Sequence, residues 1–176
     1  MNKFFRQSVL SELNLDIYCV SETHCINDEI IYVPNYKTFQ LNRKEPNCRL
    51  RGSGGVAIFI RDDLFKYHKV LSEYKCRDGL LSLKLLNVET EATVGIISNY
   101  LSPDSYKYGK NPEGYFNDLS SLWTDLSDCD LLIGGGDLNS RTKTSPDYIA
   151  DIDGNVPPRQ NPDQTENNHE NISYSS

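Results

Sequence analysis

Three residues with chemically useful side chains follow one another closely near position 140. The stretch from 130 to 141 places Asp137, Asn139 and Arg141 directly after three glycines, in the order Asp-Leu-Leu-Ile-Gly-Gly-Gly-Asp-Leu-Asn-Ser-Arg. A carboxylate can orient or deprotonate water, an amide can donate to an oxyanion, and a guanidinium can bind a phosphate. Because Gly, Asp and Asn are also the usual residues of turns, a simple turn stays an open alternative from this stretch alone.

An apolar run of strand length precedes these residues. The run from Leu131 to Ile133 predicts a buried strand that ends where the glycines begin. Glycine at such a position lets the backbone approach a ligand closely. A helix is predicted upstream, because Asn111-Pro112-Glu113 is a favourable helix start. Its apolar stripe, which we interpret as packing against a sheet, consists of Phe116, Leu119, Trp123 and Leu126.

A second carboxylate follows an earlier predicted strand. The β-prone run from Asp16 to Val20 predicts a buried strand, and Glu22 and His24 come directly after it. A carboxylate just past the end of a core strand is where an α/β protein would hold a metal ion. A solvated glutamate in a loop is the alternative interpretation.

The remaining segments predict an α/β protein. Residues 3–13 have the apolar spacing of a helix, and residues 62–78 are polar with short strands. Further strands are predicted at 30–33, 36–39 and 54–60, and a hairpin is predicted at 79–86 and 93–100. Paired strands followed by a helix and another strand indicate a mixed sheet structure with outer helices.

Composition bounds the class of protein. The 176 residues suffice for one domain with a core, and the net charge of −7 argues against long-range attraction to nucleic acid. The five cysteines are odd in number and lack a Cys-x-x-Cys pair, so a disulfide framework or a zinc site is not expected, and Cys19 and Cys129 are interpreted as small buried residues. One basic run could face phosphate or form a solvated surface, and it consists of Lys37, Arg43, Lys44, Arg49 and Arg51.

The two ends of the chain bear on location and domain bounds. No membrane-spanning run and no signal peptide are recognised, so we expect an intracellular protein of the cytoplasm or nucleus that is not secreted. Residues 151–176 are polar and predict a disordered tail, which leaves residues 1–150 as the domain.

Four stretches, taken in order, resemble the endonuclease/exonuclease/phosphatase family. They are Asp16–His24, Gly54–Ile60, Ser98–Pro103 and Leu132–Arg141, and the resemblance covers about residues 8–160. It is closest to the endonuclease domain of non-LTR (LINE-type) retrotransposons, where Ser-Glu-Thr-His, Gly-Gly-Val-Ala-Ile-Phe-Ile and Gly-Asp-Leu-Asn-Ser-Arg-Thr have close counterparts. The implied fold is a DNase I-like four-layer α/β sandwich, in which two packed mixed β-sheets are flanked by helices.

The resemblance also implies roles for individual residues. Glu22 matches the carboxylate that holds a catalytic Mg²⁺ (or Mn²⁺) ion, and such hard cations prefer oxygen ligands. Asp137 matches the aspartate that orients or deprotonates the attacking water, and Asn139 matches the partner that positions it. Tyr100 matches a tyrosine that contacts the scissile phosphate.

The same resemblance suggests phosphate contacts, partners and activity. Arg141 and His24 are the weaker candidates for phosphate contacts. The implied function is that of a Mg²⁺-dependent DNA endonuclease of retrotransposon origin, normally fused to a reverse transcriptase and not bound to a membrane. Two alternatives stay open: a catalytically inactive fragment of such a domain, or a phosphatase or sphingomyelinase with the same fold.

The chain departs from the family pattern at both ends. The family's opening strand carries an asparagine that lies upstream of the helix at 3–13, and its closing Asp-His pair lies beyond residue 176. We therefore expect an incomplete sandwich, truncated at both ends, whose activity alone is weak or absent, because catalysis by cooperating groups collapses when members are lost. Target preference and oligomeric state are not predicted.

Overall fold

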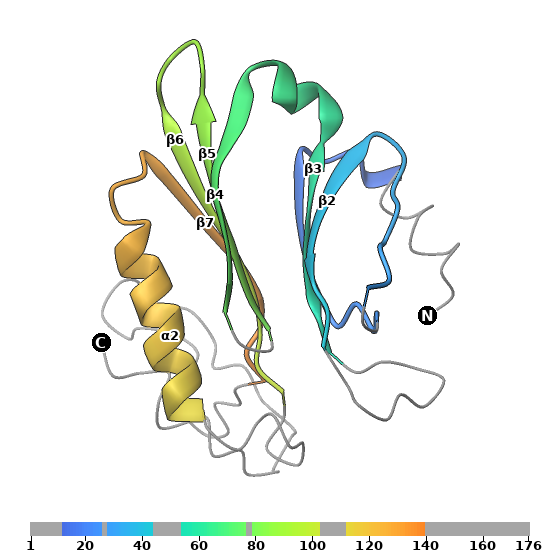
Figure 1. The fold of residues 1–176 in the computed structure, drawn as a ribbon, viewed down its shortest axis with the longest axis vertical. Helices are drawn as coiled ribbons and strands as arrows, with labels where there is room; N and C mark the ends of the chain where they lie inside the picture. The colour runs from blue at the N-terminus through green and yellow to red at the C-terminus, as the bar shows by residue number, and fades with distance from the viewer. Residues whose placement is uncertain (1–11, 26–27, 44–53, 77–78, 103–111, 140–176) are drawn as a thin grey trace, which may run out of the picture.

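Two β-sheets pack face to face, and one helix covers the outer face of the second sheet (Figure 1). The computed structural model describes residues 12–25, 28–43, 54–76, 79–102 and 112–139. The first sheet has the order β1-β3-β2, and its strands are β1 (Ile17–Ser21), β2 (Tyr36–Leu41) and β3 (Val56–Arg61). The second has the order β4-β5-β6-β7, with strands β4 (His68–Cys76), β5 (Leu80–Asn87), β6 (Thr93–Tyr100) and β7 (Leu131–Asp137).

The two sheets differ in strand direction. Both pairings in the first sheet are antiparallel, whereas the second sheet is mixed because β6 and β7 run parallel. A parallel pair needs a crossover, and helix α2 (Pro112–Asp125) lies within the connection from β6 to β7. A short 3₁₀ helix, η1 (Asp62–Lys66), follows β3. Within the described ranges, no helix is both long and apolar enough to span a membrane.

Strand β3 is the centre of the first sheet and is buried on both faces. Alternate residues of a strand point to opposite faces. Val56, Ile58 and Ile60 accordingly face the second sheet, while Ala57 and Phe59 face a smaller cluster on the other side. Burial on both faces explains why this segment is apolar at every position from 56 to 60.

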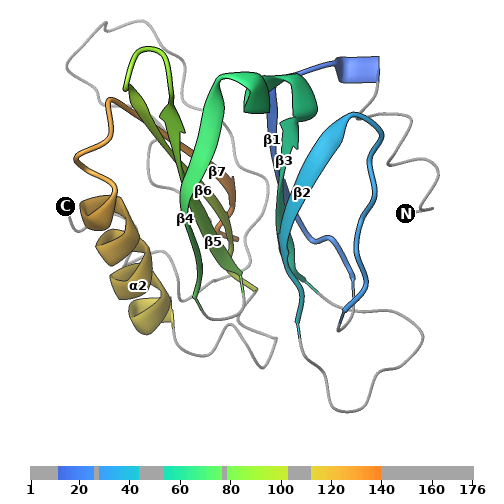
Figure 2. The same ribbon diagram turned by 45° about the horizontal axis from the view of Figure 1, so that its top comes forward.

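The main core lies between the two sheets. Figure 2 shows the two facing sheets from a second direction. The first sheet contributes β3 and Phe39, and the second contributes Leu81, Leu83, Leu85 and Ile96. A second core joins the other face of the second sheet to α2, through Leu80, Ile97, Leu101, Tyr115, Leu119, Leu122 and Leu126. The described residues therefore form three layers: sheet, sheet and helix.

Most of the predicted strands are confirmed. The strands at 36–39 and 54–60 correspond to β2 and β3, and the predicted hairpin is the antiparallel pair β5–β6. The predicted strand at 30–33 is wrong, since only Val33 makes an isolated bridge, to Tyr36. The segment 62–78 holds η1 and one nine-residue strand in place of several short ones. The predicted helix at 3–13 lies mostly outside the described residues, as does the whole tail from 151.

The buried face of α2 is offset from the predicted stripe. Tyr115, Leu119, Leu122 and Leu126 are buried, whereas Trp123 is 40% exposed. The sequence carries apolar residues on two adjacent helical rows, and the sheet covers the row that contains Tyr115. Cys19 and Cys129 are likewise half-buried and not fully buried as predicted.

The prediction for the segment around β7 is wrong in two respects. Leu131 is 53% exposed, because in the described sheet β7 is an edge strand with one neighbour, β6. The strand also continues through the three glycines as far as Asp137, so the glycines do not end it. A Cβ atom at Gly134 would lie 2.7 Å from Cζ2 of Trp123, and one at Gly135 would lie 3.1 Å from Cβ of Cys19.

The last of the three glycines meets backbone. A Cβ atom at Gly136, whose φ is 157°, would overlap the carbonyl oxygen of Asn99 on β6. The glycine run is therefore a packing feature: α2, β1 and β6 approach β7 so closely that side chains do not fit.

We predict that Gly136→Ala destabilises the protein more than Gly134→Ala. The new methyl group at 136 meets a backbone carbonyl that cannot move away, whereas at 134 it meets the end of the Trp123 ring. We expect losses in the free energy of unfolding of about 3 and about 1 kcal/mol, within the range for overpacking. Urea denaturation followed by fluorescence of Trp123, the single tryptophan, measures both. Equal losses would contradict this account of the glycines.

We also predict an acid-dependent contribution from Asp130 at the start of β7. Its carboxylate accepts hydrogen bonds from the backbone N–H (2.7 Å) and hydroxyl (3.0 Å) of Thr93, which hold the pKa of Asp130 below its usual 3.8. A lowered folded-state pKa gives stability above the unfolded pKa that is lost as the pH falls through the folded value. Asp130→Asn should therefore lose less stability than wild type between about pH 5 and about pH 2. If the free energies of unfolding of the two proteins fall in parallel as the pH is lowered, the proposed contribution of Asp130 is wrong.

Candidate active site

Three strands end at the same edge of the sandwich. Cys19 of β1 donates from Sγ to the carbonyl of Ile97 on β6 (3.9 Å), and it also lies against Gly135 of β7. Moving a few residues along each of these strands leads to Glu22, Tyr100 and Asp137. The sandwich thus places residues separated by more than a hundred positions in sequence at one edge.

A short hydrogen bond links the first two of these residues. The hydroxyl of Tyr100 donates to Oε1 of Glu22 over 2.6 Å, across the two sheets. Tyr100 is buried, whereas the Glu22 side chain is 51% exposed. Burial raises the pKa of Tyr100, and the hydrogen bond and negative charge of Glu22 raise it further. The hydroxyl is therefore protonated at neutral pH and acts as a donor.

Asp137 lies beside Tyr100 on the neighbouring strand. The two are direct partners in the parallel register of β6 and β7, and the charge of Asp137 contributes to the raised pKa of Tyr100. The backbone N–H of Asn139 donates to Oδ1 of Asp137 (2.8 Å), and the Asn139 side chain donates to the carbonyl of Leu101 (2.7 Å). Asn139 therefore fixes the Asp137 carboxylate against the end of β6, although its backbone adopts a φ of 48°.

The loop that carries Glu22 is tied to the start of β3. Glu22 and His24 both have φ of 54°, in the left-handed region. The N–H groups of Thr23 and His24 donate to the carbonyls of Gly55 (3.2 Å) and Gly54 (2.9 Å). Nε2 of His24 lies 4.0 Å from Oε2 of Glu22. The loop thus holds His24 beside the carboxylate oxygen that Tyr100 does not contact.

One residue of the site was not predicted individually. Arg43 is 2% exposed, and its Cζ lies 5.5 Å from the centre of the Tyr100 ring. Its Nη2 donates to the hydroxyl of Ser102, which follows β6. In the sequence, Arg43 belongs to a basic run that was predicted either to face phosphate or to form a solvated surface. The burial of Arg43 shows that a solvated surface is wrong for this residue. Its position directly after β2, at the same edge as Glu22, is the signal that could have identified it.

The structure thus brings together five of the six predicted site residues, namely Glu22, His24, Tyr100, Asp137 and Asn139. Arg141 lies outside the described residues. Within the described ranges, no group of three or more His, Cys, Asp or Glu side chains is close enough to hold a metal ion. Glu22 is half-exposed, and only its Oε1 accepts from Tyr100. It nevertheless fits Mg²⁺, which commonly binds one or two carboxylates and keeps several waters.

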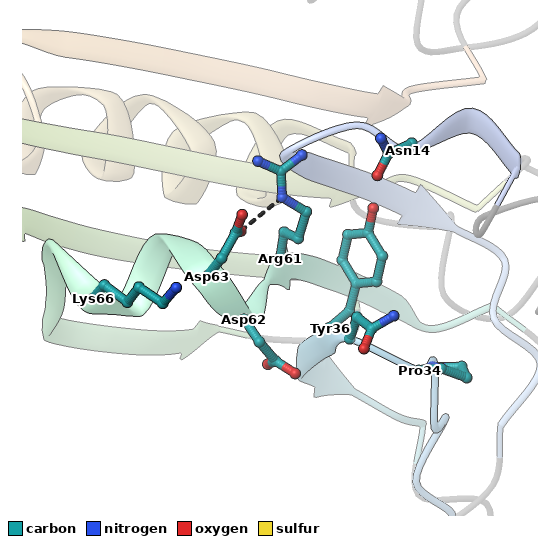
Figure 3. Close-up of a pocket in the computed structure, with 8 residues that line it drawn as sticks. Asn14, Pro34, Tyr36, Arg61, Asp62, Asp63 and Lys66 are labelled. Atoms are coloured by element: carbon teal, nitrogen blue, oxygen red, sulfur yellow. Dashed lines mark hydrogen bonds and ion pairs between the residues drawn. The ribbon is translucent and has the colours of Figure 1, made fainter.

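A surface pocket lies at the opposite end of the first sheet (Figure 3). Arg61 at its centre forms ion pairs with Asp16 (2.8 Å) and Asp63 (2.6 Å), and Tyr36 donates to the carbonyl of Leu15. The single positive charge of Arg61 is thus already matched by carboxylates of the chain, and none of the predicted site residues lines this pocket.

Comparison with known proteins gives matches in three-dimensional structure alone. No family model matches the sequence, and no curated protein matches it. The catalytic domain of human Nocturnin, solved with a bound sulfate anion, is 15% identical with a TM-score of 0.60, over 81% of this chain and 58% of that one. The AP endonuclease LMAP from Leishmania major is 14% identical with a TM-score of 0.58, over 82% and 52%. A mannosyl-6-phosphatase from Bacteroides thetaiotaomicron is 16% identical with a TM-score of 0.54, over 81% and 58%.

These similarities confirm the predicted DNase I-like fold. The identities of 14–16% establish the fold and not the activity. The chain spans between 52% and 58% of the length of the structures that it matches.

We predict that Tyr100→Phe and Glu22→Gln are coupled in their effects on stability. Tyr100→Phe removes the donor of their hydrogen bond, and Glu22→Gln removes the negative charge of its acceptor. The double variant should therefore lose less free energy of unfolding than the sum of the two single losses. We expect a coupling of about 1 kcal/mol, since Glu22 is half-exposed to water. Urea denaturation of the four proteins gives the value, and purely additive losses would show that the hydrogen bond contributes nothing.

Proposed function

We propose that the edge bearing Glu22, Tyr100 and Asp137 is the active site of a Mg²⁺-dependent phosphodiester hydrolase that acts on DNA. The observation that carries the proposal is the 2.6 Å hydrogen bond from Tyr100 to Glu22, with Asp137 as the direct strand partner of Tyr100. A protonated donor bonded to one carboxylate, with a second carboxylate on the neighbouring strand, can handle a phosphate, a water and a cation together.

In this proposal, each of the three side chains has a separate chemical role. Glu22 is the ligand through which Mg²⁺ (or Mn²⁺) would be held, and a metal bound there supplies Lewis-acid stabilisation of a phosphoryl oxygen. Asp137 is exposed, and its carboxylate can accept a proton from water while Asn139 holds it in place. The protonated hydroxyl of Tyr100 can donate to a phosphate oxygen.

DNA as the substrate rests on the sequence resemblance to retrotransposon endonucleases. The presence of an AP endonuclease among the similar structures supports that choice. Retrotransposon origin and fusion to a reverse transcriptase belong to the same proposal, as do an intracellular location and phosphate contacts from His24 and Arg141.

One specific observation favours another function. The mannosyl-6-phosphatase among the similar structures favours a phosphatase with the same fold. A catalytically inactive fragment is the third case. Two assays distinguish the three cases. Nicking of plasmid DNA indicates the endonuclease, release of phosphate from a sugar monophosphate indicates the phosphatase, and the absence of both reactions indicates the inactive fragment.

We predict weak nicking of supercoiled plasmid by the 176-residue chain in Mg²⁺, which is abolished by EDTA and by Asp137→Ala. The alanine variant loses the group that accepts the water proton, and loss of such a group costs about 10²–10⁴-fold. Gel separation of supercoiled and open-circular plasmid measures the rate.

Two controls define this experiment. Asp63→Ala removes an exposed carboxylate from the pocket at the far end of the first sheet and should leave nicking unchanged. Nicking that persists at the wild-type rate in Asp137→Ala would refute the assignment of the site.

A further inference from the structure

We infer that Arg43 is a positioning residue, which holds Tyr100 so that its hydroxyl is directed at Glu22. The kinetic part of this inference rests on the proposed function. The contact itself is a property of the folded chain and can be measured without catalysis.

The burial of Arg43 requires an explanation. The side chain is 2% exposed, and burying a charge is costly unless the charge is matched by polar or electrostatic contacts. Two such contacts come from one segment: the face of the Tyr100 ring, 5.5 Å from Cζ, and the hydroxyl of Ser102. Both residues lie at the end of β6. The guanidinium therefore spans from the end of β2 to the end of β6, across the two sheets.

The loop that carries Glu22 is also fitted to Arg43. A Cβ atom at Gly54 would lie 2.5 Å from Cζ of Arg43 and 2.6 Å from its Nη1. Gly54 also accepts the N–H of His24, two residues after Glu22. Arg43 thus contacts Tyr100 directly, and it lies against Gly54, which is hydrogen-bonded to the loop that carries Glu22.

Arginine suits this position better than lysine. A planar guanidinium can lie over an aromatic face and donate sideways at the same time, whereas an ammonium is a compact and strongly hydrated point charge. Lys at position 43 should therefore keep the charge but lose the flat contact with Tyr100. The structure assigns Arg43 a geometric role, in which shape matters as well as charge.

The test uses the full 176-residue chain with three variants that disturb this contact: Arg43→Lys, Arg43→Met and Gly54→Ala. Gly54→Ala leaves the arginine in the sequence but fills the space beside Cζ, so it reaches the same contact by a second route. The matched control is Arg61→Met, which removes an arginine from the opposite end of the same sheet. There it contacts Asp63, as Figure 3 shows, and Asp16. Circular dichroism identifies the variants that fold. If Arg43→Met or Gly54→Ala does not fold, the test is made with Arg43→Lys, which is the mildest change.

The first readout is the ring resonances of Tyr100 in ¹³C-labelled protein, assigned by their absence in Tyr100→Phe. We expect Arg43→Lys, Arg43→Met and Gly54→Ala to shift these signals and Arg61→Met to leave them unchanged. We further expect Glu22→Gln to shift the Tyr100 signals in the wild-type background. In the Arg43→Met background the shift should be much smaller, because the Tyr100 hydroxyl is then no longer directed at the side chain of residue 22. Unchanged Tyr100 signals in the folded Arg43 variants would overturn the inference.

The second readout is single-turnover nicking with protein in excess. Small misplacement of a catalytic group can cost about a hundredfold, so we expect the maximal rate to fall by roughly ten- to a hundredfold in the Arg43 variants. The protein concentration at half-maximal rate should not change. In the Tyr100→Phe background the Arg43 variants should have little additional effect, because both act through one group.

The two readouts separate failure of this inference from failure of the proposed function. A wild-type chain that nicks while the Arg43 variants nick equally fast overturns the positioning role and leaves the function standing. A wild-type chain that does not nick contradicts the function, and the Tyr100 resonances then decide the role of Arg43 alone.

Discussion

The close approach of β7 to its neighbours is the constraint on which the candidate site depends. Three consecutive glycines leave the strand without side chains where α2, β1 and β6 press against it. Because β7 lies so near β1, Asp137 ends up at the edge where Glu22 leaves the first sheet. The parallel register with β6 then places Asp137 beside Tyr100. A wider spacing between these layers would move Asp137 away from the edge at which Tyr100 donates to Glu22.

Three of the six non-glycine residues with positive φ in the described ranges lie at this edge. Glu22, His24 and Asn139 all have φ between 48° and 54°, which costs non-glycine residues about 1 kcal/mol or more each. The surrounding hydrogen bonds hold these conformations: Gly54 and Gly55 accept from the loop after β1, and Leu101 accepts from the Asn139 side chain. These hydrogen bonds fix the backbone after β1 and after β7 at the two places that carry Glu22 and Asp137.

The sequence was informative where local pattern and burial coincide, as in β3, where apolar residues fill every position from 56 to 60. It was misleading where a residue type has two uses. The glycines before Asp137 have the composition of a turn, but their neighbours in space, Trp123 and Cys19, cannot be identified from spacing. Arg43 shows the same limit, because the basic run to which it belongs left a phosphate-facing loop and a solvated surface open, whereas its burial depends on Tyr100 and Ser102 some sixty positions away.

The two arginines of the first sheet show how one residue type serves two physical purposes. Arg61 lies at one end with a side chain 29% exposed, and it forms ion pairs with two exposed carboxylates, which are worth little because water screens them. Arg43 lies at the other end, buried against an aromatic ring and a hydroxyl, where the dielectric is low and geometry is strict. A protein gains little from burying a guanidinium unless its direction matters. The two ends therefore differ in what an arginine contributes: weak surface ion pairs at one, and a fixed contact with Tyr100, the donor to Glu22, at the other.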